Sequence, residues 1–256
     1  MISVQNLNKT FTLTKQQRKE LNTDQRIATA VQDLSFSCQP GRVFSLLGPN
    51  GAGKTTTLRM IATLIAPTAG QIHINGINAL SQPQEARKHI GFLTGSTGLY
   101  ARLTPMEVID YYADLYGVEK AAREQRKEEL FSLLHMQDFL HKRIGKLSTG
   151  MKQKVSICRT MIHDPSVVIF DEPTSGLDVI TAENIIKLIR SFKEQGKTVI
   201  FSSHIMSEVD LLCDDLAIIH QGTLKYNGTM ADFRANMQTA NLTEEFIRIV
   251  QAPNSQ

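Results

Sequence analysis

The chain has 256 residues, of which 41% are hydrophobic and 21% are charged, and its formal net charge is +3. This length suits one domain, or one domain that carries a subdomain, around a core of ordinary size. The charges are mixed in sign and are not gathered into one basic face, so composition gives no argument for a nucleic-acid-binding protein, and no nucleic-acid partner is expected.

Short patterns argue against secretion, membrane spanning and a metal or disulfide scaffold. The first residues lack a basic segment followed by an apolar one, so no signal peptide is expected. No apolar run approaches the ~18 residues that a membrane-spanning helix needs. The cysteines lie far apart without a CxxC pair, which predicts reduced and mostly buried thiols at Cys38, Cys158 and Cys213.

The first third of the chain alternates short apolar runs with turns and helical patterns. Residues 12–29 are polar and have no clear period, which is typical of a hairpin insertion or a flexible loop. A strand is predicted from Val43 to Leu47, and a helix is predicted after Lys54. A half-exposed strand at 71–75 should end at an Asn-Gly turn pair. Strands that alternate with helices indicate an α/β fold.

The turn between the first predicted strand and helix carries a phosphate-binding pattern. Residues 48–55 read GPNGAGKT and fit GxxxxGK[ST] in the strand-to-helix context that this motif needs. Its glycines let successive N–H groups face phosphate oxygens, and the helix N-terminus adds partial positive charge. Lys54 is expected to reach the β- and γ-phosphates of ATP, and Thr55 to ligate Mg²⁺. The residues expected to bind the nucleotide here are Asn50, Gly51, Ala52, Gly53, Lys54, Thr55 and Thr56.

From about residue 104 to residue 165 the pattern is almost entirely helical. Thr104, Pro105 and Glu107 form a capping-box signature, which predicts that a helix begins there. The charged run at 119–130 mixes both signs. We interpret it as a solvated helical face rather than a nucleic-acid-binding patch.

Two carboxylates follow the next apolar run. Residues 167–170 are continuously apolar, which is typical of a parallel strand covered on both faces. Because ligands of open α/β sheets gather at the carboxyl ends of strands, Asp171 is expected to hold Mg²⁺ with its water shell. Glu172 is expected to accept a proton from the attacking water. Another strand is predicted at 198–202, after a helix that stops at Gly196.

Three later segments distinguish among proteins that share these motifs. Residues 147–153 read LSTGMKQ, 175–178 read SGLD and 202–204 read SSH. In this order they resemble the signature, the D-loop and the H-loop of ABC transporter ATP-binding subunits. Phe11 lies where that family places an aromatic side chain on adenine, and an ordinary core residue is the alternative. The resemblance covers residues 1–230.

The resemblance implies a fold and a domain organisation. The fold would be α/β: a P-loop NTPase with a RecA-like, mainly parallel sheet, an antiparallel β subdomain and an α-helical subdomain at about 100–163. The ATPase domain would span 1–230, and 231–256 would form a C-terminal helical extension and a polar tail. The implied cofactors are ATP and Mg²⁺.

The resemblance also implies a mechanism that needs two copies of the chain. Ser148 is expected to cap a helix whose open start at Gly150 contacts the γ-phosphate of ATP held by the partner. Asp178 is carried over with the D-loop as a nucleotide-binding residue, and His204 would hydrogen-bond the γ-phosphate and orient the water. Catalysis is assigned to Lys54, Glu172 and His204. The implied assembly is a homodimer docked on integral membrane permease subunits, peripheral at the cytoplasmic face of a bacterial cell membrane.

Two departures from the family pattern refine the expectation. Gly95 stands where most ABC ATPases carry a glutamine, which puts the usual metal or water contact at that position in doubt. In the signature, Thr149 and Met151 replace the usual Gly and Gln. The segments IGFLTGSTGLYARLT and LSTGMKQKV are similar to ABC-2 type exporter ATPases, particularly the ATPase subunit of bacterial sodium-extrusion transporters. This likeness implies export, with sodium as one candidate cargo beside lipids, drugs and peptides.

Two other classes of protein stay open at this stage. An ABC ATPase that remodels nucleic acid or ribosomes usually carries two cassettes or a long coiled coil, and neither is visible here. A non-catalytic, nucleotide-gated regulator would fit lost chemistry at Gly95, but Glu172 and His204 argue against it.

Overall fold

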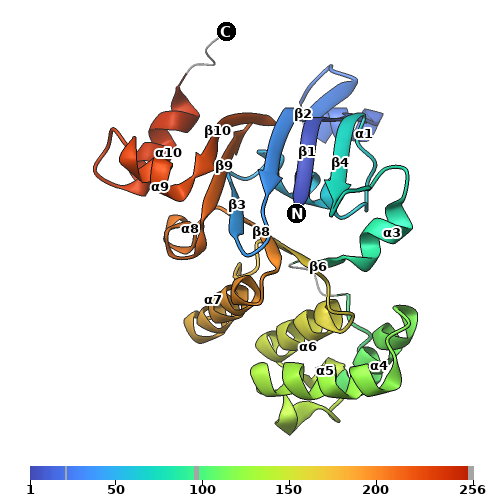
Figure 1. Ribbon diagram of the computed structural model, residues 1–256. Helices are drawn as coiled ribbons and strands as arrows, with labels where there is room; N and C mark the ends of the chain where they lie inside the picture. The colour runs from blue at the N-terminus through green and yellow to red at the C-terminus, as the bar shows by residue number, and fades with distance from the viewer. Residues whose placement is uncertain (21, 95–97, 253–256) are drawn as a thin grey trace.

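A mainly parallel sheet forms the centre of the fold in the computed structural model, which describes residues 1–20, 22–94 and 98–252 (Figure 1). Its strand order is β10-β9-β3-β8-β7-β6; all neighbours pair in parallel except β10, which is antiparallel to β9. The strands are β3 (Val43–Leu47), β6 (Ile90–Thr94), β7 (Val167–Asp171), β8 (Thr198–Ser203), β9 (Asp215–His220) and β10 (Thr223–Thr229).

The three central strands are buried along their whole length. Every residue of β3, β7 and β8 is buried, as the continuous apolar runs in these segments predict for strands covered on both faces. In the register of the sheet, Leu47 pairs with Ser203 and Asp171 pairs with Ser202. The residues that follow β3, β7 and β8 therefore emerge side by side at one edge of the sheet.

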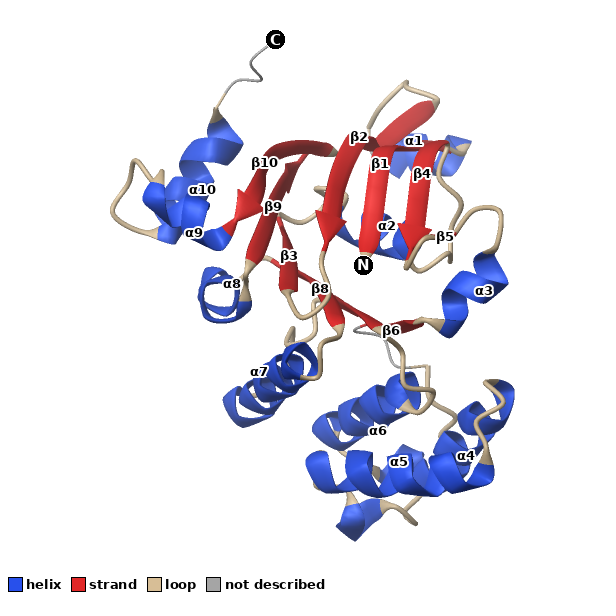
Figure 2. Ribbon diagram, in the orientation of Figure 1, coloured by secondary structure: helices blue, strands red, loops and turns tan. Residues whose placement is uncertain are grey.

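A second, antiparallel sheet lies beside the first (Figure 2). Its order is β2-β1-β4-β5, with β1 (Ile2–Thr12), β2 (Ile27–Cys38), β4 (Ala69–Ile74) and β5 (Ile77–Asn78). The polar residues 12–29 are the end of a β1-β2 hairpin that carries the short helix α1 (Lys15–Glu20), so the hairpin alternative is the correct one. Strand β4 ends at the predicted turn, where Asn75 and Gly76 both have positive φ, 50° and 83°.

Helices flank the sheets, and α4, α5 and α6 form a separate layer below the central sheet in the view of Figure 2. The helices are α2 (Lys54–Ile61), α3 (Pro83–Lys88), α4 (Pro105–Leu115), α5 (Lys120–Leu133), α6 (Thr149–Met161), α7 (Val179–Glu194), α8 (Met206–Leu212), α9 (Met230–Ala235) and α10 (Leu242–Gln251). Short 3₁₀ turns lie at Gln137–Phe139 and Ile144–Lys146. Among the described residues, no helix is both long and apolar enough to cross a membrane.

The helical layer confirms one local prediction and corrects another. Helix α4 begins with the predicted capping box, because the Thr104 hydroxyl accepts the Glu107 N–H at 3.3 Å while the Glu107 carboxylate accepts the Thr104 N–H at 2.7 Å. Helix α5 is mostly solvated as predicted, but Lys127 is buried. Its ammonium lies 2.9 Å from the Asp110 carboxylate and 2.8 Å from that of Glu124, and these contacts offset the cost of its burial.

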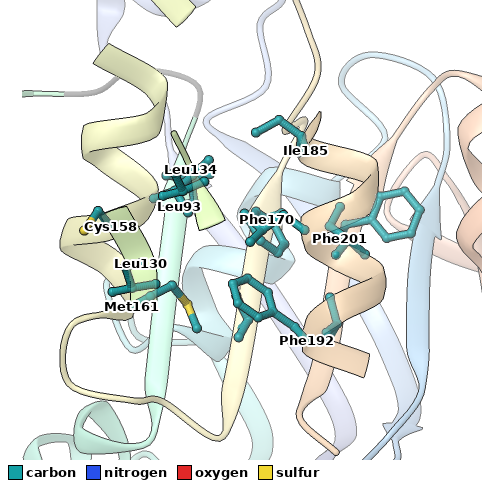
Figure 3. Close-up of a cluster of buried hydrophobic side chains, with 14 of the residues drawn as sticks. Leu93, Leu130, Leu134, Cys158, Met161, Phe170, Ile185, Phe192 and Phe201 are labelled. Carbon is teal, nitrogen blue, oxygen red and sulfur yellow. The ribbon is translucent and has the colours of Figure 1, made fainter. Parts of the chain in front are cut away.

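Two hydrophobic clusters lie on opposite faces of the central sheet. Alternate residues of β7 supply both, because successive side chains of a strand point to opposite faces. Phe170 belongs to the cluster under the helices, where its ring stacks on Phe192 (Figure 3). Ile169 belongs to the cluster between the sheets, where Phe36 and Phe44 stack with ring centroids 5.1 Å apart. Each such fully buried side chain stabilises the fold by about 1.5–3 kcal/mol.

All three cysteine thiols are free, and two of them are buried, as the sequence predicts. Cys38 and Cys158 are buried, whereas Cys213 is half-buried. Burial raises the pKa of all three thiols, to about 12 for Cys213. None of the three is therefore prepared for nucleophilic chemistry.

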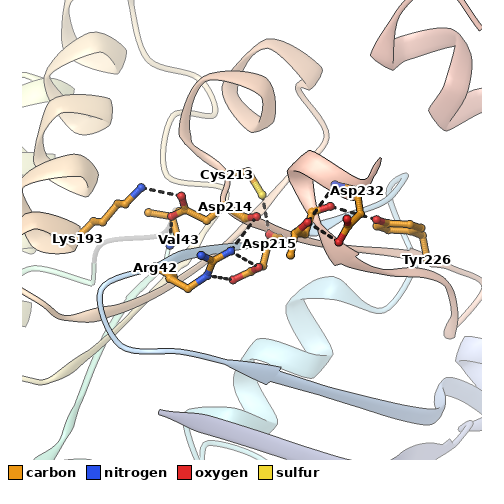
Figure 4. Close-up of polar contacts among 9 residues, drawn as sticks. Arg42, Val43, Lys193, Cys213, Asp214, Asp215, Tyr226 and Asp232 are labelled. Atoms are coloured by element: carbon orange, nitrogen blue, oxygen red, sulfur yellow. Dashed lines mark hydrogen bonds and ion pairs between the residues drawn. The ribbon is translucent and has the colours of Figure 1, made fainter. Parts of the chain in front are cut away.

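A polar network holds the beginning of β3 (Figure 4). Arg42 donates twice to the Asp215 carboxylate, each time at 2.6 Å. Asp214 accepts the Val43 N–H at 2.8 Å and the Lys193 ammonium at 2.7 Å. These charge-assisted bonds join β3, β9 and the end of α7.

Helix α10 contains a buried carboxylate whose partners all lie in the C-terminal segment. Glu245 is 2% exposed and accepts hydrogen bonds from Arg248, from the Thr239 hydroxyl and from the Gln238 N–H. The Arg248 guanidinium and these donors lower the pKa of Glu245 to about 2. The segment after β10 is therefore an ordered part of the fold up to the end of α10.

Candidate functional site

The glycine-rich turn lies between β3 and α2, as predicted. Gly51 and Gly53 have positive φ, 77° and 106°, which other residues adopt only with strain. A Cβ atom at Gly53 would lie 2.5 Å from the Ala30 carbonyl oxygen, and one at Gly48 would lie 2.3 Å from the Ile219 carbonyl oxygen. The backbone of this turn is thus packed too closely for side chains at Gly48 and Gly53.

Lys54 directs its ammonium into the turn. Its Nζ donates to the carbonyl oxygens of Gly48 at 2.7 Å and Pro49 at 3.1 Å, and it lies 3.6 Å from the Glu172 carboxylate. The residue is 4% exposed. Burial lowers the pKa of the Lys54 ammonium, and the Glu172 carboxylate opposes this effect. The remaining predicted residues of the turn are placed as follows: Asn50 is exposed, Ala52 is buried, and Thr55 and Thr56 are half-buried.

Asp171 ends β7 and collects two hydroxyl groups on one carboxylate oxygen. The Thr55 hydroxyl donates to Asp171 Oδ1 at 2.9 Å, and the Ser202 hydroxyl donates to the same atom at 2.8 Å. Oxygen donors from one or two side chains, completed by phosphate oxygens and water, are the set that Mg²⁺ prefers. The pair of Thr55 and Asp171 therefore fits a magnesium ion bound beside phosphates.

Glu172 is held in an unusual backbone conformation. Its φ is 49°, a left-handed value that costs on the order of 1–3 kcal/mol for such a residue. Its N–H donates to the Ser202 hydroxyl at 3.0 Å, and its carboxylate lies 3.3 Å from His204 Nδ1. The structure therefore brings together three residues that sequence places far apart: Lys54, Glu172 and His204.

Ser148 begins helix α6 as its N-cap, which confirms the predicted cap. Its hydroxyl accepts the Met151 N–H at 3.2 Å. A Cβ atom at Gly150 would lie 3.2 Å from the Thr181 hydroxyl of α7, so α6 and α7 approach closely there. Asp178 caps α7 and accepts both the N–H of Thr181, at 3.0 Å, and its hydroxyl, at 2.7 Å. Figure 2 shows α6 below the central sheet and α2 above it, and the buried residues of the two helices belong to the clusters on opposite faces of that sheet. The helix that Ser148 caps and the helix that follows the phosphate turn therefore lie on opposite faces.

The structure tests one of the alternatives for Phe11 but does not describe Gly95. The Phe11 ring is 41% exposed near the end of β1, and the Lys9 ammonium lies 4.9 Å from its centroid. A core role is thereby excluded for Phe11, and stacking on adenine stays a prediction. Gly95 lies outside the described residues.

Sequence reasoning missed the hydroxyl groups that support the site. Ser202 appears in the sequence only as part of the run before His204, and its bonds to residues 171 and 172 depend on β7 and β8 being neighbours. Thr57 likewise braces the turn, because its hydroxyl donates to the Gly53 carbonyl oxygen at 2.9 Å. The Ser202 contacts join residues far apart in sequence, so no local pattern marks them, whereas the Thr57 bond spans four residues of one helix.

Comparison with known proteins gives the family. A family model described as ABC transporter matches residues 31–175. The chain belongs to this family. The ABC transporter ATP-binding protein NatA of Bacillus subtilis (strain 168) is 41% identical over 223 residues, which cover 87% of this chain and 91% of NatA. The bacitracin transport ATP-binding protein BcrA of Bacillus licheniformis is 40% identical over 196 residues, which cover 76% of this chain but 63% of BcrA.

Solved structures of ABC proteins share the whole fold. The ATP-binding subunit of an ABC transporter superposes with a TM-score of 0.84 at 29% identity, over 97% of this chain and 99% of that one. The dimeric structure of MJ0796, a bacterial ABC transporter cassette, gives a TM-score of 0.77 at 25% identity, over 90% of this chain and 99% of that one. These findings confirm the predicted fold and family: the chain is the ATP-binding subunit of an ABC transporter and an ATPase.

Proposed function

We propose that this ABC ATPase powers export through a separate membrane permease and works as a homodimer that closes on two ATP molecules. One observation carries the proposal: the residues that end or follow β3, β7 and β8 meet at one edge of the sheet, where the Glu172 carboxylate lies 3.6 Å from the Lys54 ammonium and 3.3 Å from the His204 ring. This is the place where open α/β sheets bind ligands.

The phosphates of ATP would lie on the turn before α2. Backbone N–H groups of residues 50–56 and the N-terminus of α2 offer partial positive charge to phosphate oxygens. Lys54 adds a full positive charge and would contact the β- and γ-phosphates. Thr55 and Asp171 would hold the magnesium ion, which neutralises charge on the phosphates when bound. Phe11 would stack on the adenine ring.

Hydrolysis needs a base beside the γ-phosphate. A water molecule would attack the γ-phosphorus as the bond to the oxygen of ADP breaks, and Glu172 would accept the proton that the water loses. His204 would hydrogen-bond the γ-phosphate and orient the water. The contact of 3.3 Å between His204 Nδ1 and Glu172 supports a joint action of the two side chains.

The γ-phosphate site would be completed by a second copy of the chain. Ser148 and Gly150 would open helix α6 toward an anion, and α6 lies on the face of the sheet opposite to α2, the helix that follows the phosphate turn of the same chain. A head-to-tail pair would bring the start of α6 of one copy onto the ATP of the other, with Asp178 of the D-loop beside it. The MJ0796 cassette, which shares this fold and is a dimer in its solved structure, supports this arrangement. The dimer would dock on permease subunits at the cytoplasmic face of the membrane.

Sodium is the cargo that the short segments around residues 90–104 and 147–155 favour, through their similarity to sodium-extrusion ATPases. The relatives BcrA and LnrL are named for bacitracin transport and linearmycin resistance, so peptide or antibiotic cargo is the competing outcome. In everted vesicles that contain this chain and its permease, ATP should drive uptake of radioactive sodium. Uptake of a labelled antibiotic, without sodium uptake, would contradict the sodium assignment.

Replacing the base tests the enzymatic part of the proposal. Glu172→Gln should lower ATP turnover by about 10²–10⁴-fold, because an amide cannot accept the proton, while ATP binding is retained. Glu183→Gln, which alters an exposed carboxylate on α7, is the matched control and should turn over ATP at the wild-type rate. Equal ATP turnover by wild type and Glu172→Gln would contradict the proposed mechanism.

A further inference from the structure

One buried carboxylate near the site has no part in the mechanism above. Glu208, on α8, is 9% exposed. One of its oxygens accepts the Thr174 hydroxyl, and the other accepts the Ser203 hydroxyl at 2.9 Å. Thr174 and Ser203 are themselves buried, with exposures of 7% and 2%. We call these three side chains the Glu208 clamp.

The clamp joins the two segments that carry the proposed base and histidine. Thr174 lies two residues after Glu172 and directly before the D-loop, and Ser203 directly precedes His204. Glu208 itself lies in the first turn of the helix that follows His204. A single side chain thus connects the end of β7, the end of β8 and the start of α8.

The hydrogen-bond pattern uses both oxygens of the Glu208 carboxylate. Ser203 Oγ already accepts the Ile205 N–H at 3.0 Å, so its proton is directed to Glu208. The Thr174 proton is directed to the second carboxylate oxygen. A carboxylate accepts both hydroxyl groups at once, whereas an amide offers only one accepting oxygen.

A related arrangement occurs at the neighbouring position of the sheet edge, at Asp171, where one carboxylate oxygen accepts both hydroxyl groups. There the Glu172 N–H donates to the Ser202 hydroxyl, Ser202 donates to Asp171, and Thr55 donates to the same carboxylate. In both cases a serine hydroxyl of β8 accepts a hydrogen bond from a backbone N–H and donates its own proton to a carboxylate. The same carboxylate also accepts a hydrogen bond from a threonine hydroxyl. Consecutive serines of one strand therefore fix the segments on either side of the Glu172–His204 contact.

Stability alone is a poor explanation for the clamp. Within the described residues, Glu208 has hydroxyl partners but no ion-pair partner. A buried carboxylate without a cation is costly, and an apolar residue of similar size would pack there at lower cost. The clamp is better suited to specifying one geometry than to adding stability.

We propose that Glu208 is a positioning residue for ATP hydrolysis: it sets the place of His204 relative to Glu172 by holding Ser203 and Thr174 on one carboxylate. The inference rests on the proposed roles of Glu172 and His204. Because Thr174 directly precedes the D-loop, the clamp would also make movement of the D-loop and of His204 interdependent.

The first test measures turnover and nucleotide affinity together. Glu208→Ala should lower kcat by about 100-fold, the effect expected when a reacting group is misplaced by about 1 Å, with KM for ATP within about threefold of wild type. Glu208→Gln should recover part of the loss, because it keeps one accepting oxygen. Glu245→Ala, which removes another buried carboxylate that accepts a threonine hydroxyl, is the matched control and should lower thermal stability while leaving kcat unchanged.

A double-mutant test separates positioning from general destabilisation. If Glu208 acts through His204, then adding Glu208→Ala to His204→Ala should lower kcat by less than about threefold further. A purely structural role would lower kcat by the same factor in both backgrounds, and that result would overturn the inference. Should Glu208→Ala fail to fold, Glu208→Gln and Thr174→Val give the same comparison.

The outcomes for the inference and for the proposed function can be told apart. If Glu172→Gln abolishes turnover but Glu208→Ala and Thr174→Val match wild type, the positioning role is wrong and the function stands. If Glu172→Gln matches wild type, the proposed mechanism fails whatever Glu208 does.

Discussion

At Lys54, the ammonium is enclosed by the carbonyl oxygens of Gly48 and Pro49 and faces the Glu172 carboxylate. A buried cation is costly unless it has partners, and Lys54 has partners on both sides of the site. Its position was foreseeable, because the spacing of the motif fixes where the lysine stands relative to the turn. Its link to Glu172 was not, because that contact spans more than a hundred residues of chain.

Removing this charge should weaken ATP binding. Lys54→Ala is expected to raise the dissociation constant for Mg-ATP by about 10–100-fold, because a hydrogen bond to a charged group contributes about 1.5–3 kcal/mol. Titration with a fluorescent ATP analogue measures the effect. Lys88→Ala, which removes a lysine that is largely exposed, should bind like wild type. Unchanged affinity in Lys54→Ala would contradict its proposed role.

At the scale of elements, a stacked pair joins the end of α4 to the end of α6. The ring centroids of Tyr116 and His163 lie 3.7 Å apart, and the angle between the ring planes is 3°. Both rings line a cavity of about 490 Å³. His163 Nε2 contacts the Ile90 carbonyl oxygen at 3.1 Å, whereas its buried Nδ1 has no hydrogen-bond partner among the described residues. Burial lowers the pKa of His163 from 6.5 to about 4, and the nearby Asp164 and Lys197 have smaller effects of opposite sign to each other.

This pair should make stability depend on pH. Because the folded-state pKa of His163 lies below the unfolded value of 6.5, the unfolded chain binds the proton more readily between pH 6.5 and pH 4. The contribution of His163 to the free energy of unfolding is thus complete above pH 6.5 and is lost as the pH falls toward 4. Urea denaturation at stepped pH should show a weaker dependence in this window for His163→Phe, which keeps the stacking.

An exposed histidine provides the control for that measurement. His141→Gln should leave the pH dependence as it is in wild type. An identical pH dependence for wild type and His163→Phe would show that His163 does not titrate in this window.

Elements with local signals were predictable, and contacts between elements were not. The capping box at Thr104 and the stop at Gly196, where φ is 76°, follow from residues a few positions apart. The burial of Lys127 was missed because its partner Asp110 lies on another helix. Glu208 could not be recognised as part of the site, since Thr174 is 34 residues away and meets it only through the pairing of β7 with β8.

For the whole molecule, the central expectation is a dimer that forms on ATP. Family membership was readable from the order of five motifs, because each motif is local and the order is fixed by the fold. The sequence does not give the faces of the sheet that α6 and α2 cover, and the structure places the helix capped by Ser148 on the face opposite to the helix that follows the phosphate turn. The proposed second copy would bring the start of its own α6 to the nucleotide on this phosphate turn.

The dimer can be measured directly. Glu172→Gln, mixed with Mg-ATP, should elute as a dimer in size exclusion with light scattering. Adding Ser148→Glu should keep it monomeric, because a carboxylate at the start of α6 would repel the γ-phosphate. Ser132→Glu adds the same charge at an exposed site on α5 and should leave the dimer intact. A strictly monomeric Glu172→Gln protein, even with its permease supplied, would refute the two-copy mechanism.

The tight approach of Gly150 to Thr181 has a consequence for how such a pair would run. Within each chain, the turn that would serve the neighbour's nucleotide rests directly on the helix capped by Asp178. In the proposed dimer, a shift of that helix would change the contacts at both nucleotides, and this coupling would not need the permease. Two ATP molecules in such an assembly would be consumed in concert or in alternation, and not as independent events.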